Sequence, residues 1–269
     1  MIASLLTRKD ELMIVREHEK TFSFVQQHHH GHLAGELMKH WKKDMFPEDQ
    51  WRHSVLTAIR NHDIGWAPFD KQPFWNDAKS VPFRFTDFPL LPKTVLYRQG
   101  IDDVEKIDHY AAMLCSLHYE QFIQSNNEKE AKLFIEGEQN RRERLYKEIE
   151  DFDKELFEKH FALLQLGDNF SLYCCVNDPG VAKANEHIFF RDGIPSTGIF
   201  PALPIGRIGI YFADQHTIKV ENYPFSYSFD VEVKQKTVLK KDIEDQGLLV
   251  AYEEADYELI PFHITPANK

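Results

Sequence analysis

The stretch Trp51-Arg-His-Ser-Val-Leu-Thr-Ala-Ile-Arg-Asn-His-Asp-Ile-Gly-Trp66 joins an apolar helical stripe to a histidine and an aspartate. Its apolar residues from Trp51 to Ile59 recur every three or four positions, which predicts one face of an α-helix. His62 continues this face, and Gly65 is a typical helix terminator. Asp63 follows His62 at the fraying last turn, where both side chains can reach one ion.

The histidine-rich segment Gln27-His-His-His-Gly-His-Leu-Ala-Gly35 opens a second apolar stripe. His30 shares a helix face with apolar residues that run to Trp41, so it is predicted to point at the core. His32 shares a face with charged residues and is predicted to point at water. His30 is therefore the candidate ligand of this segment. The alternative is a helix-opening histidine that the backbone or water satisfies.

Two later stripes each carry one ligand-type side chain. His118 lies on the inward face of a helix predicted over residues 110–122, either as a ligand or as a core histidine with one hydrogen bond. Asp168 follows Leu164 by four positions on the last stripe, which covers residues 156–172. A buried carboxylate without a partner is strongly unfavourable. Asp168 is therefore expected to contact an arginine, a lysine or a metal ion.

Together, His30, His62, Asp63, His118 and Asp168 predict a metal site. Imidazole and carboxylate groups suit divalent ions such as Mn, Fe, Ni, Zn or Mg. Two neutral histidines and two aspartates balance one such ion, and His118 could extend the site toward a second one. Asp63, Asp168 and His118 are the expected catalytic residues. The sequence holds no Cys-x-x-Cys, no phosphate-binding or dinucleotide-binding glycine motif, and no Gly-x-Ser-x-Gly.

Four segments look like the uncharacterised bacterial family catalogued as domain of unknown function 3891. They are Gln27–Gly35, His62-Asp-Ile-Gly-Trp66, Ala111-Ala-Met-Leu-Cys-Ser-Leu-His118 and the C-terminal region with Pro224-Phe-Ser-Tyr and Pro261-Phe-His-Ile-Thr.

The order of the ligands along the chain resembles the HD superfamily of metal-dependent phosphohydrolases. This resemblance implies a helical bundle around one metal site. His30 would be the first ligand, His62 and Asp63 the paired ligands, and Asp168 the last, while His118 matches the helix histidine of the uncharacterised family.

The expected fold class is mainly α, an HD-domain-like helical bundle with a C-terminal antiparallel β-rich extension. Residues 1–26 are expected to form a short β element and a loop. Residues 27–178 form the helical core, with an insertion over 67–100 whose five prolines preclude a regular helix. Residues 179–269 form the extension, packed on the core.

Hydropathy with a period of two supports the β-rich extension. The segments 217–221, 229–233 and 248–252 alternate well enough to predict antiparallel strands. The extension could also form the interface of a homo-oligomer.

Composition bounds the possible partners. The chain has 269 residues, 42% hydrophobic and 28% charged, which suits one large globular domain or one domain with a substantial extension. A net charge of −11 disfavours bulk nucleic-acid binding. No apolar run is long enough to span a membrane. Cys115, Cys174 and Cys175 cannot build a disulfide framework, so a cytoplasmic location is expected.

The expected function is hydrolysis of a small phosphate ester or nucleotide by a metal-activated water. Many HD hydrolases have a lysine where this chain has Trp66, which puts the usual phosphate contact in doubt. Whether the chain is an enzyme at all is therefore left open. The alternatives are a non-catalytic protein that senses a ligand and a di-iron oxygenase. Four cations are candidate phosphate contacts: Lys39, Arg60, Arg84 and Arg98.

Overall fold

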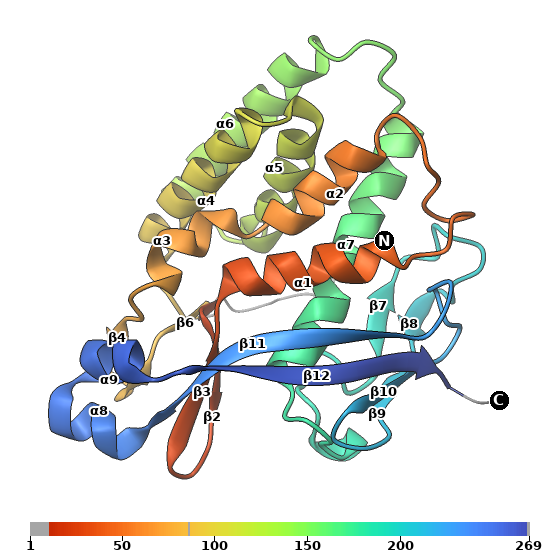
Figure 1. Ribbon diagram of the computed structural model, residues 1–269. Coiled ribbons are helices and arrows are strands. Elements are labelled where there is room, and N and C mark those ends of the chain that lie inside the picture. The colour runs from red at the N-terminus through yellow and green to blue at the C-terminus, as the bar shows by residue number, and fades with distance from the viewer. Residues whose placement is uncertain (1–10, 86, 268–269) are drawn as a thin grey trace.

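A layer of helices packs on one face of a curled six-stranded sheet in the computed structural model, which describes residues 11–85 and 87–267 (Figure 1). The structure is 47% helical and 20% strand. The predicted mainly α, HD-domain-like bundle is therefore wrong. The prediction failed because strands from both ends of the chain build one sheet, and the N-terminal strands lack a clear period of two.

The sheet has the order β2-β3-β11-β12-β10-β9. Neighbouring strands are antiparallel except β10 and β12, which run parallel. The sheet is therefore mixed, whereas purely antiparallel strands were predicted. The strands are β2 (Ile14–Glu17), β3 (Thr21–Val25), β9 (Ile210–Phe212), β10 (Thr217–Val220), β11 (Phe229–Leu239) and β12 (Tyr257–Pro266).

The hairpin of β2 and β3 is buried on both faces, which explains why it does not alternate. Ile14 and Val25 pair across the hairpin and belong to the main core beneath the helices. Val15 and Phe24 pair one position away and belong to a smaller core that includes Tyr252. Residues on both faces of the strand are therefore apolar. A loop was expected over part of this hairpin.

The four predicted apolar stripes form helices, as expected. Figure 1 shows α1 lying along the sheet above β11, with α7 beside it. The long helices are α1 (Gln27–Lys39), α2 (Arg52–Asn61), α4 (Leu90–Glu105), α5 (His109–Ile123), α6 (Lys129–Tyr146) and α7 (Lys154–Val176).

The proline-rich insertion contains more regular structure than predicted. It holds the short elements α3 (Ala67–Asp70), β4 (Trp75–Asn76), β5 (Val81–Pro82) and β6 (Arg84–Phe85), of which β6 pairs with β1 (Glu11–Leu12). It also holds the first part of α4, which the prolines were expected to exclude. Pro89 precedes α4 and Pro92 lies in its first turn, where the missing N–H breaks no helical hydrogen bond.

The C-terminal region contains one further error of prediction. The segment expected as a strand over 248–252 is helix α9 (Leu248–Glu254), which follows α8 (Lys240–Gln246). Leu248, Ala251 and Tyr252 are buried, at a helical spacing of three and four. Segments 217–221 and 229–233 are strands β10 and β11, as predicted. A hairpin of β7 (Ile194–Ser196) and β8 (Gly206–Ile208) packs beside α7. Among the described residues, no helix is both long and apolar enough to cross a membrane.

Candidate metal centre

Four helical segments bring five ligand-type side chains to one buried place. His30 lies in the first turns of α1, and Asp168 lies in the middle of α7. His62 follows the end of α2, and Asp63 precedes the 3-10 turn η1 (Ile64–Trp66). His118 lies on α5. All five are buried, and helical periodicity predicted this for all except Asp63.

Four of these side chains converge on one point. The Nε2 atom of His30 lies 3.2 Å from Nε2 of His62 and 3.1 Å from Oδ1 of Asp168. His62 Nε2 lies 3.5 Å from the same Asp168 oxygen. Oδ2 of Asp63 lies 3.5 Å from His62 Nε2 and 3.8 Å from His30 Nε2. Two imidazole nitrogens and two carboxylate oxygens therefore face each other.

His118 lies at the edge of this group. Its ring centroid is 4.9 Å from that of His62, nearly perpendicular to it. One ligand atom each from His62, Asp63 and His118 lie within 4.8 Å of one another, and the same holds for His30, His62 and Asp168. The two sets share His62.

Hydrogen bonds on the far side of each ring decide which nitrogen faces the centre. His62 Nδ1 lies 2.7 Å from the carbonyl oxygen of Ile59, which can only accept, so Nδ1 carries a proton. Ser171 donates its hydroxyl proton to the carbonyl of Asp168, so its oxygen accepts from Nδ1 of His30 at 2.8 Å. In their neutral forms, both rings therefore direct an Nε2 lone pair at the centre.

The charges of the centre are strongly coupled. Burial works to lower the pKa of His62, but the carboxylates of Asp63 and Asp168 outweigh it and raise that pKa to about 9. Burial works to raise the pKa of Asp168, but hydrogen bonds from His30 and His62 hold it well below its usual value. Burial raises the pKa of Asp63 despite the neighbouring imidazoles. Without a metal ion, a proton on His62 thus balances part of the negative charge.

A distant carboxylate sets where α1 begins. Oδ1 and Oδ2 of Asp70 accept hydrogen bonds from the backbone N–H groups of Gln27 and His28, at 3.0 and 2.9 Å. These N–H groups have no partner within the helix, and a carboxylate at this end also suits the helix dipole. Burial raises the pKa of Asp70 to about 7, although both N–H groups act to lower it. Asp70 therefore fixes the first turn, which carries His30.

The turn after Asp63 packs closely on α4. A Cβ atom on Gly65 would lie 2.4 Å from the carbonyl oxygen of Leu96, and one on Gly100 would lie 2.6 Å from the backbone nitrogen of Gly65. Only glycine fits at such a close approach. The glycine of the His62-Asp-Ile-Gly motif therefore has a packing role, which holds His62 and Asp63 against α4 and α5.

Three of the predicted phosphate contacts have partners away from the centre. Lys39 and Arg60 both pair with Glu36, at 2.8 and 2.6 Å. Arg84 lies 3.5 Å from Glu17. The structure therefore gives these cations other roles.

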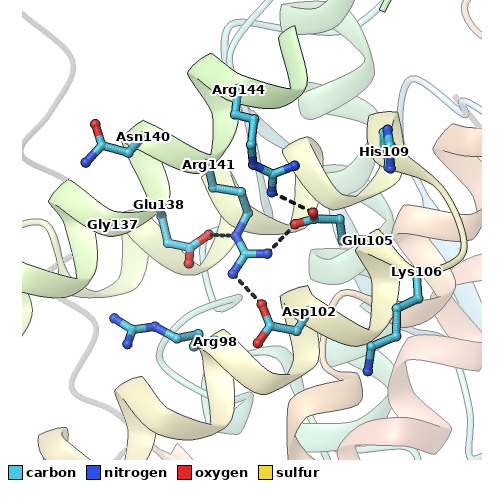
Figure 2. Close-up of a pocket in the computed structure, with 10 residues that line it drawn as sticks. All are labelled: Arg98, Asp102, Glu105, Lys106, His109, Gly137, Glu138, Asn140, Arg141 and Arg144. Atoms are coloured by element: carbon cyan, nitrogen blue, oxygen red, sulfur yellow. Dashed lines mark hydrogen bonds and ion pairs between the residues drawn. The ribbon is translucent and has the colours of Figure 1, made fainter. Parts of the chain in front are cut away.

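The fourth predicted cation, Arg98, lines a pocket of 850 Å³ between α4 and α6 (Figure 2). Arg141 reaches across this pocket to Asp102 at 2.5 Å and to Glu138 at 3.0 Å, and it also pairs with Glu105 (Figure 2). Such a network neutralises most of the pocket's charge and ties the two helices together. None of the metal candidates lines this pocket.

The aromatic insertion is partly ordinary core. Trp66 is buried and packs edge-on against Phe88 and Tyr97. Phe69 packs on Phe88 and on Phe74, and the side chain of Phe74 is exposed to solvent. Trp66 therefore belongs to the core.

Sequence reasoning missed the supporting residues Ser171 and Asp70. Ser171 lies three positions after Asp168 on the same buried face of α7, so a polar residue on an apolar stripe was the available signal. Asp70 lies in the insertion, and nothing in its spacing connects it to the start of α1.

Residues 13–240 match the profile of the family described as Protein of unknown function (DUF3891). The chain belongs to this family. No curated protein and no solved structure matches the chain significantly.

Proposed function

We propose that this chain is a metal-dependent hydrolase of small phosphate esters or nucleotides. His30, His62, Asp63 and Asp168 would hold one divalent ion. The order of these ligands along the chain, as in HD phosphohydrolases, supports the reaction class. The fold does not support it, because the sheet departs from a helical bundle.

One observation carries the proposal: the Nε2 atoms of His30 and His62 lie 3.2 Å apart. The hydrogen bond that each ring makes through its Nδ1 atom turns its Nε2 atom toward the other ring. Neutral rings in this arrangement would point two lone pairs at each other. They repel unless a proton or a cation lies between them. Two carboxylate oxygens share the same space, so a divalent ion would satisfy all four donors at once. The hydrogen bonds that His62 and His30 donate to Ile59 and Ser171 are those that metal-bound histidines usually make.

The same hydrogen bonds favour a single ion over two. His62 has one lone pair toward the centre, because Nδ1 is bonded to Ile59. His62 therefore cannot bind one ion together with His30 and Asp168 and a second ion together with Asp63 and His118. A second ion would depend on Asp63 as a bridge and on His118. This counts against the di-iron oxygenase, which needs two ions, and iron content with oxygen consumption would reverse that judgement.

A bound ion would lower the pKa of a coordinated water toward neutrality and polarise a phosphoryl oxygen. The residues of the chain would position the reactants. The side chain of Asp63 is 10% exposed and that of Asp168 is 6% exposed, while those of His30 and His62 are fully buried. Water or substrate would therefore approach from the carboxylate side. Asp63 and His118 would be placed to orient that water and to move its proton.

A ligand-sensing protein is the second candidate. The observation in its favour is that Lys39, Arg60 and Arg84 form ion pairs elsewhere, and Trp66 is buried in the core. A hydrolase must bind the phosphate of its substrate, and these residues are committed to other contacts. A thermal-shift screen separates the two functions, because a sensed ligand stabilises the protein without being consumed.

The decisive experiment combines metal analysis with a substrate screen. The protein is purified without chelator and tested on a panel of phosphate esters with Mn, Ni, Co, Mg or Zn. The proposal expects turnover that His62→Ala and Asp63→Ala both abolish. His53→Ala is the matched control, because His53 is exposed on the same helix α2. Absence of turnover with every metal, or equal turnover in the His62→Ala protein, would refute the hydrolase.

A further inference from the structure

The outer side of α1 carries three histidines that the buried centre does not use: His28, His29 and His32. His30 lies about 200° around the helix from His28, so the two point in opposite directions. We infer that His28 and His32 form a second, solvent-facing metal site. This inference does not rest on the proposed function.

His28 and His32 are four positions apart, which places both side chains on one helix face, one turn apart. Their ring centroids lie 4.1 Å apart, with the ring planes inclined by 56°. Two imidazoles at right angles around one ion, with bonds of about 2.1 Å, hold their ligand nitrogens ~3 Å apart. The same spacing supplies both histidines of the His-Glu-x-x-His zinc motif. The two rings therefore already lie within reach of a shared ion.

An unbonded ring nitrogen of His28 and the exposure of both histidines also fit a metal site that faces solvent. Nδ1 of His28 is buried, and it has no hydrogen-bond partner among residues 11–85 and 87–267. His28 is half-buried and His32 is exposed. A site made from them would be open on one side, with water completing the coordination.

The carboxylate and the third histidine beside these two rings have other partners. Glu36, one further turn along the face, pairs with both Arg60 and Lys39, so its carboxylate is committed to these two cations. His29 instead packs edge-on against the ring of Tyr257. These contacts define a site of two imidazoles with no committed carboxylate.

His32 opens into a groove of 440 Å³ between α1 and β11. Figure 1 shows these two elements running side by side. Asp230 and Glu232 of β11 line the groove with Lys234, so its acidic groups outnumber its lysine and favour an approaching cation.

The ligand type selects the metal. Two imidazoles without a carboxylate favour borderline divalent ions, with Cu²⁺ bound more tightly than Ni²⁺ or Zn²⁺. Mg²⁺ and Ca²⁺ prefer oxygen ligands and would not bind. The site would therefore accept transition metals alone.

The test titrates the full chain with Cu²⁺ and compares variants by calorimetry and electron paramagnetic resonance. In a His62→Ala background, which removes one imidazole of the buried centre, His32→Gln and His28→Gln should each lose one bound Cu²⁺ per chain, together with the signal of coupling to two imidazole nitrogens. His53→Gln, which changes an exposed histidine on α2, should keep both. His62→Ala should also keep the outer ion, so failure of the buried centre is distinguishable from failure of this site.

Unchanged Cu²⁺ stoichiometry in both His32→Gln and His28→Gln would overturn the inference. Equal loss in His53→Gln would also overturn it, because it would show non-specific binding to surface histidines. His32 is exposed, so His32→Gln should fold normally, and circular dichroism verifies this before the titration.

Discussion

Ser171 decides which nitrogen of His30 is available to the centre. Its hydroxyl donates to the carbonyl of Asp168, so its oxygen can only accept from Nδ1 of His30. Ile59 does the same for His62 through its carbonyl oxygen. At the scale of single residues, the candidate centre therefore depends on groups that bind no ion themselves.

Ser171→Ala should weaken metal binding without removing a ligand. The ring of His30 would lose the acceptor that fixes its orientation, and loss of such a partner typically lowers metal affinity ~10–100-fold. Competition with a chromophoric chelator measures the affinity. Ser228→Ala is the control, because Ser228 is exposed and bonds Thr265. Equal affinities in the Ser171→Ala and native proteins would argue against the proposed role of His30.

The directions of the candidate ligands could be predicted from the sequence. A spacing of three and four residues places His30, His62, His118 and Asp168 on apolar faces, and the structure buries all four. Their mutual distances could not be predicted, because they depend on how α1, α2, α5 and α7 cross. Metal binding itself stays a prediction.

At the scale of elements, the contact between η1 and α4 holds the His62–Asp63 turn in place. Gly100→Ala should lower the free energy of unfolding by about 1–3 kcal/mol, as overpacking usually does. The added Cβ would lie 2.6 Å from the backbone nitrogen of Gly65, which cannot move freely. Urea denaturation measures the change.

Gly137→Ala on α6 is the matched control for this substitution. Its Cβ would meet only the end of Arg98, at 3.7 Å, which is ordinary contact. Alanine favours a helix over glycine by roughly 1 kcal/mol, so this variant should be as stable as the native protein or more so. If Gly100→Ala were equally stable, the packing role of the two glycines would be wrong.

The start of α1 gives a second prediction at this scale. Asp70→Ala should lower the free energy of unfolding by roughly 0.5–2 kcal/mol, the usual effect of losing a helix cap. Two backbone N–H groups would lose their acceptor in a buried place. Thermal unfolding measures the loss, and Asp77→Ala, at an exposed position of the same insertion, should show little change. If the Asp70→Ala protein were as stable as the native protein, α1 would not need Asp70 as a cap.

The elements that sequence reasoning missed are those buried on two faces or short. Phe24 and Val25 of β3 face different cores, so no alternation marks the strand. The run from Leu248 is apolar enough for either a strand or a helix, and only its packing decides. Pro92 shows that a proline at a helix start is compatible with the helix that follows.

At the scale of the whole molecule, His160 makes stability depend on pH. Burial lowers its pKa to about 4, and the hydroxyl of Tyr110 lies 2.7 Å from its Nδ1. The unfolded chain, with a pKa of about 6.5, therefore binds more protons than the folded chain between those two values. The contribution of His160 to the free energy of unfolding should be complete above pH 6.5 and should be lost as the pH drops toward 4.

Thermal unfolding from pH 7 to pH 4.5 tests this dependence. His160→Gln keeps an acceptor for Tyr110 but cannot take up a proton, so its stability should fall less over this range. Burial also lowers the pKa of His29, so His29 contributes to the pH dependence of both proteins. Because the native and variant proteins differ only at residue 160, the difference between their curves reports His160 alone. Parallel curves for the two proteins would contradict the assignment.

The fold of the whole molecule was the least predictable feature. The six-stranded sheet needs the pairing of β3 with β11, whose residues Val25 and Gln235 are far apart in the chain. Local patterns carry no information on such pairing. The sequence resemblance therefore led to the family correctly and to a helical bundle wrongly.

The most direct test of the central claim is the metal content of the purified protein, compared with that of Asp168→Asn. Asparagine keeps the size of the side chain but removes the charge that a divalent ion needs. Both proteins carry the His32→Gln substitution, so that the outer site does not contribute. Elemental analysis should find about one equivalent of a divalent transition metal per chain in the protein with Asp168 and almost none in the variant. A protein that stays metal-free after incubation with these ions, or an Asp168→Asn protein with the same content, would contradict it.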